Sequence, residues 1–106
     1  MPFIAYDLSL DLVRLLRPLL PAIKDHDPDL ADQIRRAATS VVMNLAEGSG
    51  RRGKERAYHY RIARGSVQEV RSGLEAADAW GYVDKPRLAE ASHLAHRIAG
   101  MLWRLG

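Results

Sequence analysis

Residues 60–77 read YRIARGSVQEVRSGLEAA, and this stretch decides the fold. Its apolar side chains recur at alternating steps of three and four residues, which places them on one face of a helix: Tyr60, Ala63, Val67, Val70, Leu74 and Ala77. A repeat of this kind is typical of helices that pack side by side in a left-handed bundle. We therefore expect a long helix whose apolar stripe faces the core of such a bundle.

Two further stripes follow the same segment. The first comprises Ile62, Ser66, Glu69, Gly73 and Ala76, with Gly65 beside it, and its small side chains let another helix approach closely. The second stripe is polar, and we expect it to face water: Arg61, Arg64, Gln68, Arg71, Glu75 and Asp78. The helix thus offers a second packing surface beside its core face.

Upstream, apolar residues at helical spacing predict a first helix over residues 5–25. Pro18 lies inside it, and a proline both removes a backbone donor and clashes with the carbonyl four residues back. We therefore expect a kink near Arg14, and we expect Pro21 to distort the last turn.

Capping residues mark the other helices. Asp27 followed by Pro28 predicts the start of a second helix that runs to about Glu47. Three glycines within residues 48–53 predict a break before the third helix, which Gly81 ends.

A fourth helix opens at Asp84 and Pro86. Its apolar face comprises Leu88, Ala91, Leu94, Ala95, Ile98, Met101, Leu102 and Leu105. No segment shows the alternation of a strand. Short connections between amphipathic helices favour an all-α fold, an antiparallel up-down-up-down four-helix bundle that forms a single domain over residues 1–106.

The composition limits the class of protein. The chain has 106 residues, which suits one domain with a modest core. It has no cysteine, so neither disulfides nor thiolate metal sites can stabilise it. Charged residues interrupt its most apolar early stretch, which argues against a membrane span. We expect a cytoplasmic protein with no membrane partner.

The net charge of +3 is unevenly distributed. Residues 1–34 carry three basic and six acidic side chains, residues 35–71 carry nine and three, and residues 72–106 carry four and four. The middle third, at +6, suits a polyanionic partner, although a solvated charged face without a partner is the commoner outcome.

The basic group that we expect to bind nucleic acid comprises Arg51, Arg52, Lys54, Arg56, Arg61 and Arg64. Guanidinium groups suit paired contacts with phosphate, and Tyr58 or His59 could stack on an unpaired base. Because no base-reading motif accompanies this group, we expect the binding to be electrostatic and weakly sequence-specific.

A second set of polar residues flanks the apolar faces of the second and third helices and forms a predicted polar seam: Arg36, Ser40, Asn44, Glu47, Ser66 and Glu69. We expect Arg36 or Arg52 to pair with Glu47 or Glu69. Such a seam could be catalytic, bind a ligand, or satisfy buried polar groups between helices or subunits. We favour the structural role, because buried polar networks commonly determine register and partner choice.

Other candidate sites are weak. Residues 48–54 have the spacing of a phosphate loop, but Glu55 replaces the required Ser or Thr, and a helix precedes the loop instead of a strand. Glu55 with His59, or His93 with His96, gives too few ligands for a metal. We therefore expect no catalytic residue, no metal and no cofactor.

Residues 33–48, QIRRAATSVVMNLAEG, and residues 62–69, IARGSVQE, resemble two blocks of the four-helix-bundle family named for the 23S ribosomal RNA intervening-sequence protein. The family also includes the accessory variability protein of diversity-generating retroelements. The positions that match its motifs are Arg36, Ser40, Asn44, Glu47, Gly48, Arg52, Gly65, Ser66 and Glu69. Met43 departs from the pattern, since the family often has proline or a smaller residue there.

The resemblance implies a ring-shaped homopentamer with a positively charged surface and no established enzymatic activity. In the retroelement branch it implies association with RNA or DNA and with a reverse transcriptase. Our leading hypothesis is a non-catalytic oligomeric accessory protein that associates with RNA or DNA. The alternatives are a structural ring that organises another protein without binding nucleic acid, and a metal-dependent nuclease that uses Glu47 and Glu69.

Overall fold

The computed structural model describes residues 3–105. Five α-helices lie within this range: α1 (Ile4–Leu16), α2 (Leu20–His26), α3 (Pro28–Ser49), α4 (Gly53–Trp80) and α5 (Lys85–Leu105). These residues contain no β-strand, so the prediction of an all-α fold is confirmed. The number of helices differs from the prediction, which had four.

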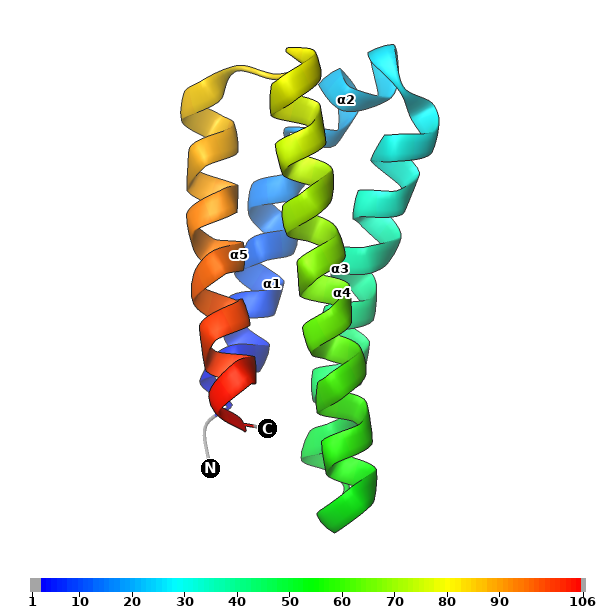
Figure 1. Ribbon diagram of the computed structural model, residues 1–106, viewed down its shortest axis with the longest axis vertical. Coiled ribbons are helices and arrows are strands. Elements are labelled where there is room, and N and C mark those ends of the chain that lie inside the picture. Colours follow the sequence, from blue (N-terminus) through cyan, green and yellow to red (C-terminus); the bar gives the residue numbers. More distant parts are fainter. Residues whose placement is uncertain (1–2, 106) are drawn as a thin grey trace.

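The four longer helices lie side by side along the long axis of the molecule (Figure 1). In this view α1 and α4 run upward, α3 and α5 run downward, and the short α2 lies at the top, next to the start of α3. α1 packs on α3 and on α5, α4 packs on the same two helices, and α2 packs on α3. The core therefore lies between α1, α3, α4 and α5.

The break between α1 and α2 corrects the expectation of one helix over residues 5–25. α1 continues regularly past Arg14, where we expected a kink, and the chain then makes a turn in which the N–H of Leu19 donates to a carbonyl three residues back, at 2.9 Å. Pro18 lies in this turn because it has no N–H to offer a helix. Pro21 lies at the start of α2, where the first N–H groups have no helical partner in any case.

The predicted caps of α3 and α4 are confirmed. Oδ1 of Asp27 accepts a hydrogen bond of 3.0 Å from the N–H of Leu30 in the first turn of α3. The chain turns from α3 into α4 at residues 50–52, and Gly53 then has a φ of +57°. Gly81 ends α4 with a φ of +75°, a left-handed conformation that favours glycine.

The predicted core stripe of α4 is buried, as are Leu12 of α1, Ile34 of α3 and Ile98 of α5. α3 and α4 approach so closely that a Cβ at Gly73 would lie 2.6 Å from Cγ1 of Ile34. Leu105, which we expected on the apolar face of the last helix, is 45% exposed. None of the helices in residues 3–105 is long and apolar enough to cross a membrane.

Candidate nucleic-acid interface

A hydrogen-bond network joins α3 to α4 along the predicted polar seam. The hydroxyl oxygens of Ser40 and Ser66 lie 2.7 Å apart. Nδ2 of Asn44 donates to the carbonyl and hydroxyl oxygens of Ser40, at 2.9 and 3.2 Å, and its Oδ1 lies 3.0 Å from Nδ1 of His59. Because that amide oxygen can only accept, Nδ1 of His59 donates. The structure thus brings three predicted seam residues together and adds His59 to them.

The remaining seam residues lie outside this network. Arg36 pairs with Asp32 on its own helix, with 3.0 Å between Nε and Oδ2. Glu47 pairs with an arginine of the α3–α4 turn at 3.1 Å, and Glu69 makes no ion pair within residues 3–105. The expected ion pairs of Arg36 or Arg52 with Glu47 or Glu69 are therefore wrong. Helical periodicity showed which residues share a face, but not which charges are nearest.

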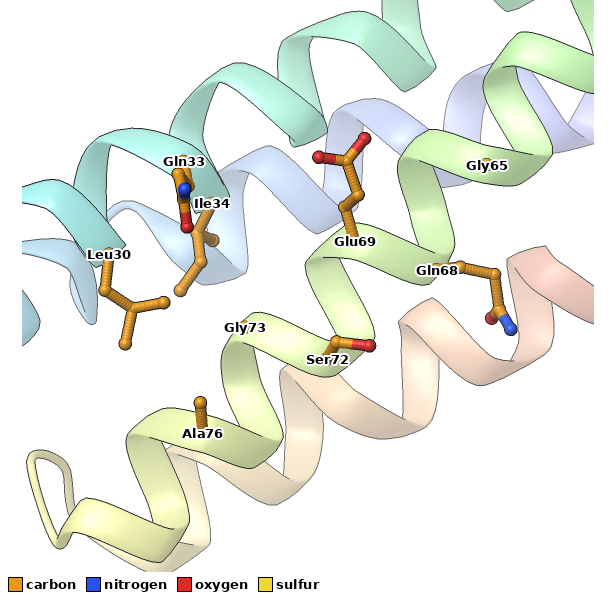
Figure 2. Close-up of a pocket in the computed structure, with 9 residues that line it drawn as sticks. All are labelled: Leu30, Gln33, Ile34, Gly65, Gln68, Glu69, Ser72, Gly73 and Ala76. Atoms are coloured by element: carbon orange, nitrogen blue, oxygen red, sulfur yellow. The ribbon is translucent and has the colours of Figure 1, made fainter.

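Glu69 instead borders a groove of about 430 Å³ between α3 and α4, which we call the α3–α4 groove (Figure 2). In Figure 2 its carboxylate points toward α3, while Leu30 and Ile34 of α3 point toward Gly73. A Cβ at Gly65, farther along the groove, would meet no atom within 4 Å. The groove is lined by Leu30, Gln33, Ile34, Gly65, Gln68, Glu69, Ser72, Gly73 and Ala76.

Two arginines of the predicted nucleic-acid site are engaged within the chain. Arg51 lies between Glu55 and Glu47, at 3.3 and 3.1 Å. Its pKa is raised above the ordinary value, most strongly by the hydrogen bond to Glu55 and next by the charge of Glu47. Arg56 donates to the carbonyl oxygens of the last two residues of α3, at 3.1 and 3.3 Å. The carbonyl of Gly48 also accepts from the N–H of Arg51 at 3.1 Å, so Arg56 adds a second donor there and supplies a donor to the carbonyl of Ser49 at the end of the helix. Both side chains therefore stabilise the turn.

Arg52, Lys54 and Arg61 are exposed and make no ion pair or side-chain hydrogen bond within the described part of the chain. The α3–α4 turn, which carries Arg52, and the first turn of α4, which carries Lys54, lie at the lower end of the molecule in Figure 1. The opposite end, where α2 meets α3, carries a cluster of carboxylates: Asp25, Asp27, Asp29 and Asp32. Arg17, Lys24, Arg35 and Arg36 lie in the same segment and balance these carboxylates in number, so the excess positive charge of the bundle lies at the turn end.

A second groove, of about 670 Å³, lies between α4 and α5, and we call it the α4–α5 groove. It is lined by Arg61, Arg64, Gly65, Gln68, Arg71, His96, Ala99, Gly100, Trp103 and Arg104. None of these lining residues is acidic. Four guanidinium groups and no carboxylate therefore line the groove.

Contacts across the α4–α5 groove hold its side chains in place. Cζ of Arg64 lies 4.9 Å from the centroid of the Trp103 ring, a cation–π contact, and Trp103 remains 71% exposed. Arg71 donates to Oε1 of Gln68 at 2.7 Å and to Nδ1 of His96 at 3.0 Å. The expectation that this stripe of α4 simply faces water is thus wrong for Arg64 and Arg71, which are half-buried beside α5.

The weaker candidates have other roles or too few members. Within residues 3–105 no three His, Asp or Glu side chains are placed to hold a metal ion. Residues 48–54 form the end of α3, a turn and the start of α4. Nδ1 of His96 accepts from an arginine, and Glu55 is paired with Arg51. What the structure assembles is positive charge, hydrogen-bond donors and an exposed aromatic ring.

The sequence analysis gave no nucleic-acid-binding role to four basic or aromatic residues of the α4–α5 groove: Arg71, His96, Trp103 and Arg104. A signal was present, because His96, Gly100 and Trp103 follow one another at steps of four and three, and Arg61, Arg64, Gln68 and Arg71 follow one another on α4 at steps of three, four and three. Two such stripes line one groove only if the helices that carry them are neighbours, and the spacing does not show that.

The comparison with curated proteins finds no match. Among solved structures, a similar fold is that of a protein of unknown function from the S23 ribosomal protein family of Bacteroides thetaiotaomicron, with a TM-score of 0.85 and 18% sequence identity over 96% of this chain and 97% of that chain. The family model described as 23S rRNA-intervening sequence protein matches residues 3–104. The chain therefore belongs to the 23S rRNA-intervening sequence protein family.

Proposed function

We propose that this chain is a non-catalytic, cytoplasmic, oligomeric accessory protein, an antiparallel four-helix bundle that associates with RNA or DNA. The observation that carries the proposal is the α4–α5 groove, whose lining has four arginines and no acidic residue. Guanidinium groups match the geometry of phosphate oxygens and form paired, charge-assisted hydrogen bonds with them. An exposed tryptophan in the same groove adds the aromatic surface that proteins binding single strands combine with positive charge.

The basic residues near the groove have two different roles. Arg51 and Arg56 hold the α3–α4 turn in shape through bonds within the chain. Arg52, Lys54 and Arg61 keep their donors available for phosphate and extend the positive surface from the groove to the end of the bundle. No contact of this kind reads a base, so the affinity should depend steeply on salt and weakly on sequence.

The test compares two triple variants that lower the net charge equally. Arg52→Ala with Lys54→Ala and Arg61→Ala removes the available basic side chains near the groove. Arg17→Ala with Lys85→Ala and Arg87→Ala removes three exposed basic side chains elsewhere and serves as the control. Binding to mixed-sequence RNA and DNA is measured by fluorescence anisotropy as salt is raised.

We expect the first variant to bind more weakly, with a plot of log affinity against log salt that is flatter by about 2 to 3 units, because each lost phosphate contact removes roughly 0.7–0.9. The control should keep the wild-type slope. Failure of the wild type to bind at low salt, or equal losses in both variants, would sink the proposal.

The alternative is a homo-oligomeric ring, a pentamer as the family resemblance implies, that organises a partner protein such as a reverse transcriptase without binding nucleic acid. It is supported by the open space at Gly65 in the α3–α4 groove and by Met43, which is 57% exposed on α3. Light scattering after size exclusion should then give a stable oligomer that Glu69→Ala disrupts while helix content is kept. A monomeric wild type would contradict this alternative.

A further inference from the structure

The chain has two tryptophans, and both are 71% exposed, but they have different neighbours. Trp80 stacks on Tyr82, which in turn stacks on His26, with centroid distances of 6.2 and 4.9 Å. Its ring thus belongs to a ladder that ties the end of α4 to α2. Trp103 has no aromatic neighbour within residues 3–105 and lies in the α4–α5 groove among arginines.

Arg64 prepares Trp103 for stacking. Its guanidinium group lies 4.9 Å from the ring centroid, so it covers one face of the indole. Because the residue remains 71% exposed, the opposite face is open to solvent. The cation–π contact restricts the rotamers of both side chains, which places the open face before any ligand arrives.

The floor of the groove admits a flat ligand close to the backbone. A Cβ at Gly65 would meet no atom within 4 Å, and one at Gly100 would meet only Nη1 of Arg104, at 3.7 Å. Neither glycine is therefore needed for packing within the described chain, although glycine inside a helix lowers its stability. Gly65 lines both grooves, and Gly100 lines the α4–α5 groove alone.

We infer that the α4–α5 groove binds single-stranded nucleic acid, with one unpaired base stacked on the open face of Trp103 and the flanking phosphates held by Arg61 and Arg104. This inference rests on the proposed function and names the form of nucleic acid that the groove selects. In a duplex both faces of every internal base are already stacked, so the ring gains nothing unless a base is flipped out. Every base has a π face, so the stacking tolerates any sequence.

The experiment measures the affinity of the full-length protein for a mixed-sequence single-stranded oligonucleotide and for the matching duplex. Trp103→Leu removes the ring, Trp103→Phe keeps a smaller one, and Trp80→Leu is the control at equal exposure. We expect Trp103→Leu to weaken single-strand binding roughly 5- to 150-fold and to leave duplex binding unchanged. Trp103→Phe should recover part of the loss, and Trp80→Leu should bind both probes as the wild type does.

Fluorescence gives a second readout that does not require loss of the ring. In a Trp80→Phe background, Trp103 is the single tryptophan, and single strands should quench its emission while the duplex does not. If Trp103→Leu leaves single-strand affinity unchanged, or weakens both probes equally, the inference is wrong while the proposed function stands. If the wild type binds neither probe at low salt, the proposed function and the inference both fall.

Discussion

The hydroxyl groups of Ser40 and Ser66 share a hydrogen bond across the α3–α4 interface, with 2.7 Å between their oxygens. Ser66 is only 5% exposed, so its hydroxyl has little access to water. We expect Ser66→Ala to lower the free energy of unfolding by about 0.5–1.5 kcal/mol, measured by urea denaturation. Ser72→Ala, which removes an exposed hydroxyl from the same helix, should change it little. A double-mutant cycle with Ser40→Ala should show coupling, and additive losses would contradict a direct bond.

Gly73 and Gly65 should respond oppositely to the same substitution. Gly73→Ala places a Cβ 2.6 Å from Cγ1 of Ile34 and should destabilise the protein by about 1–3 kcal/mol. Gly65→Ala adds a Cβ in open space and should stabilise α4 by about 0.5–1 kcal/mol. Thermal unfolding of both variants tests this. A loss of stability in Gly65→Ala would show that another chain or ligand already occupies that space.

Tyr60 should make the protein sensitive to alkali. Burial raises the pKa of Tyr60 above its ordinary value, an effect that the charge of Arg56 partly opposes. The unfolded chain therefore loses this proton above about pH 10, while the folded chain keeps it to a higher pH. The stability that the buried, protonated hydroxyl contributes is fully present below the unfolded pKa and is lost as pH rises through the folded pKa.

The check is a series of urea midpoints from neutral to alkaline pH. Tyr60→Phe, which cannot titrate, should lose less stability over the alkaline range than the wild type does. Tyr58→Phe removes a hydroxyl from a residue that is 53% exposed, and it should follow the wild-type curve. Parallel alkaline curves for Tyr60→Phe and the wild type would contradict the assignment.

Arg56 should be a stabilising residue more than a binding one. Its two hydrogen bonds to the last carbonyls of α3 predict that Arg56→Ala costs about 1 kcal/mol of unfolding free energy and speeds amide exchange in the last turn of α3. Lys54→Ala, beside it and without a bond within residues 3–105, should leave both quantities unchanged. Equal effects of the two variants would show that the Arg56 side chain is solvated and does not stabilise the end of α3.

The sequence predicted the buried stripe of α4 and the caps at Asp27 and Gly81, because these depend on spacing and on local backbone chemistry. It did not predict the split between α1 and α2. Leu19 and Ile23 keep the helical spacing across Pro18 and are both buried, so the apolar pattern continues where the helix does not. Hydrophobic periodicity alone cannot distinguish a kink from a break at a proline.

The candidate site was predicted only where one helix or one turn is enough to define it. The sequence predicted the basic residues at the α3–α4 turn. It could not predict which of them bond within the chain and which remain available for phosphate, because this depends on carbonyls and carboxylates that the fold brings near. The contact of Arg64 with Trp103 joins residues on two helices. Neither helix reveals it alone, since the rotation of each about its own axis is set by the core.

The excess of basic residues at one end of the bundle has a consequence for encounter rates under the proposed function. A body whose positive charge lies off its centre experiences a torque in the field of a polyanion before the two touch. Under that proposal the molecule arrives with its basic end forward, and a larger fraction of collisions is productive. Salt would reduce this advantage by shortening the range of the field, which slows association even where the final contacts are the same.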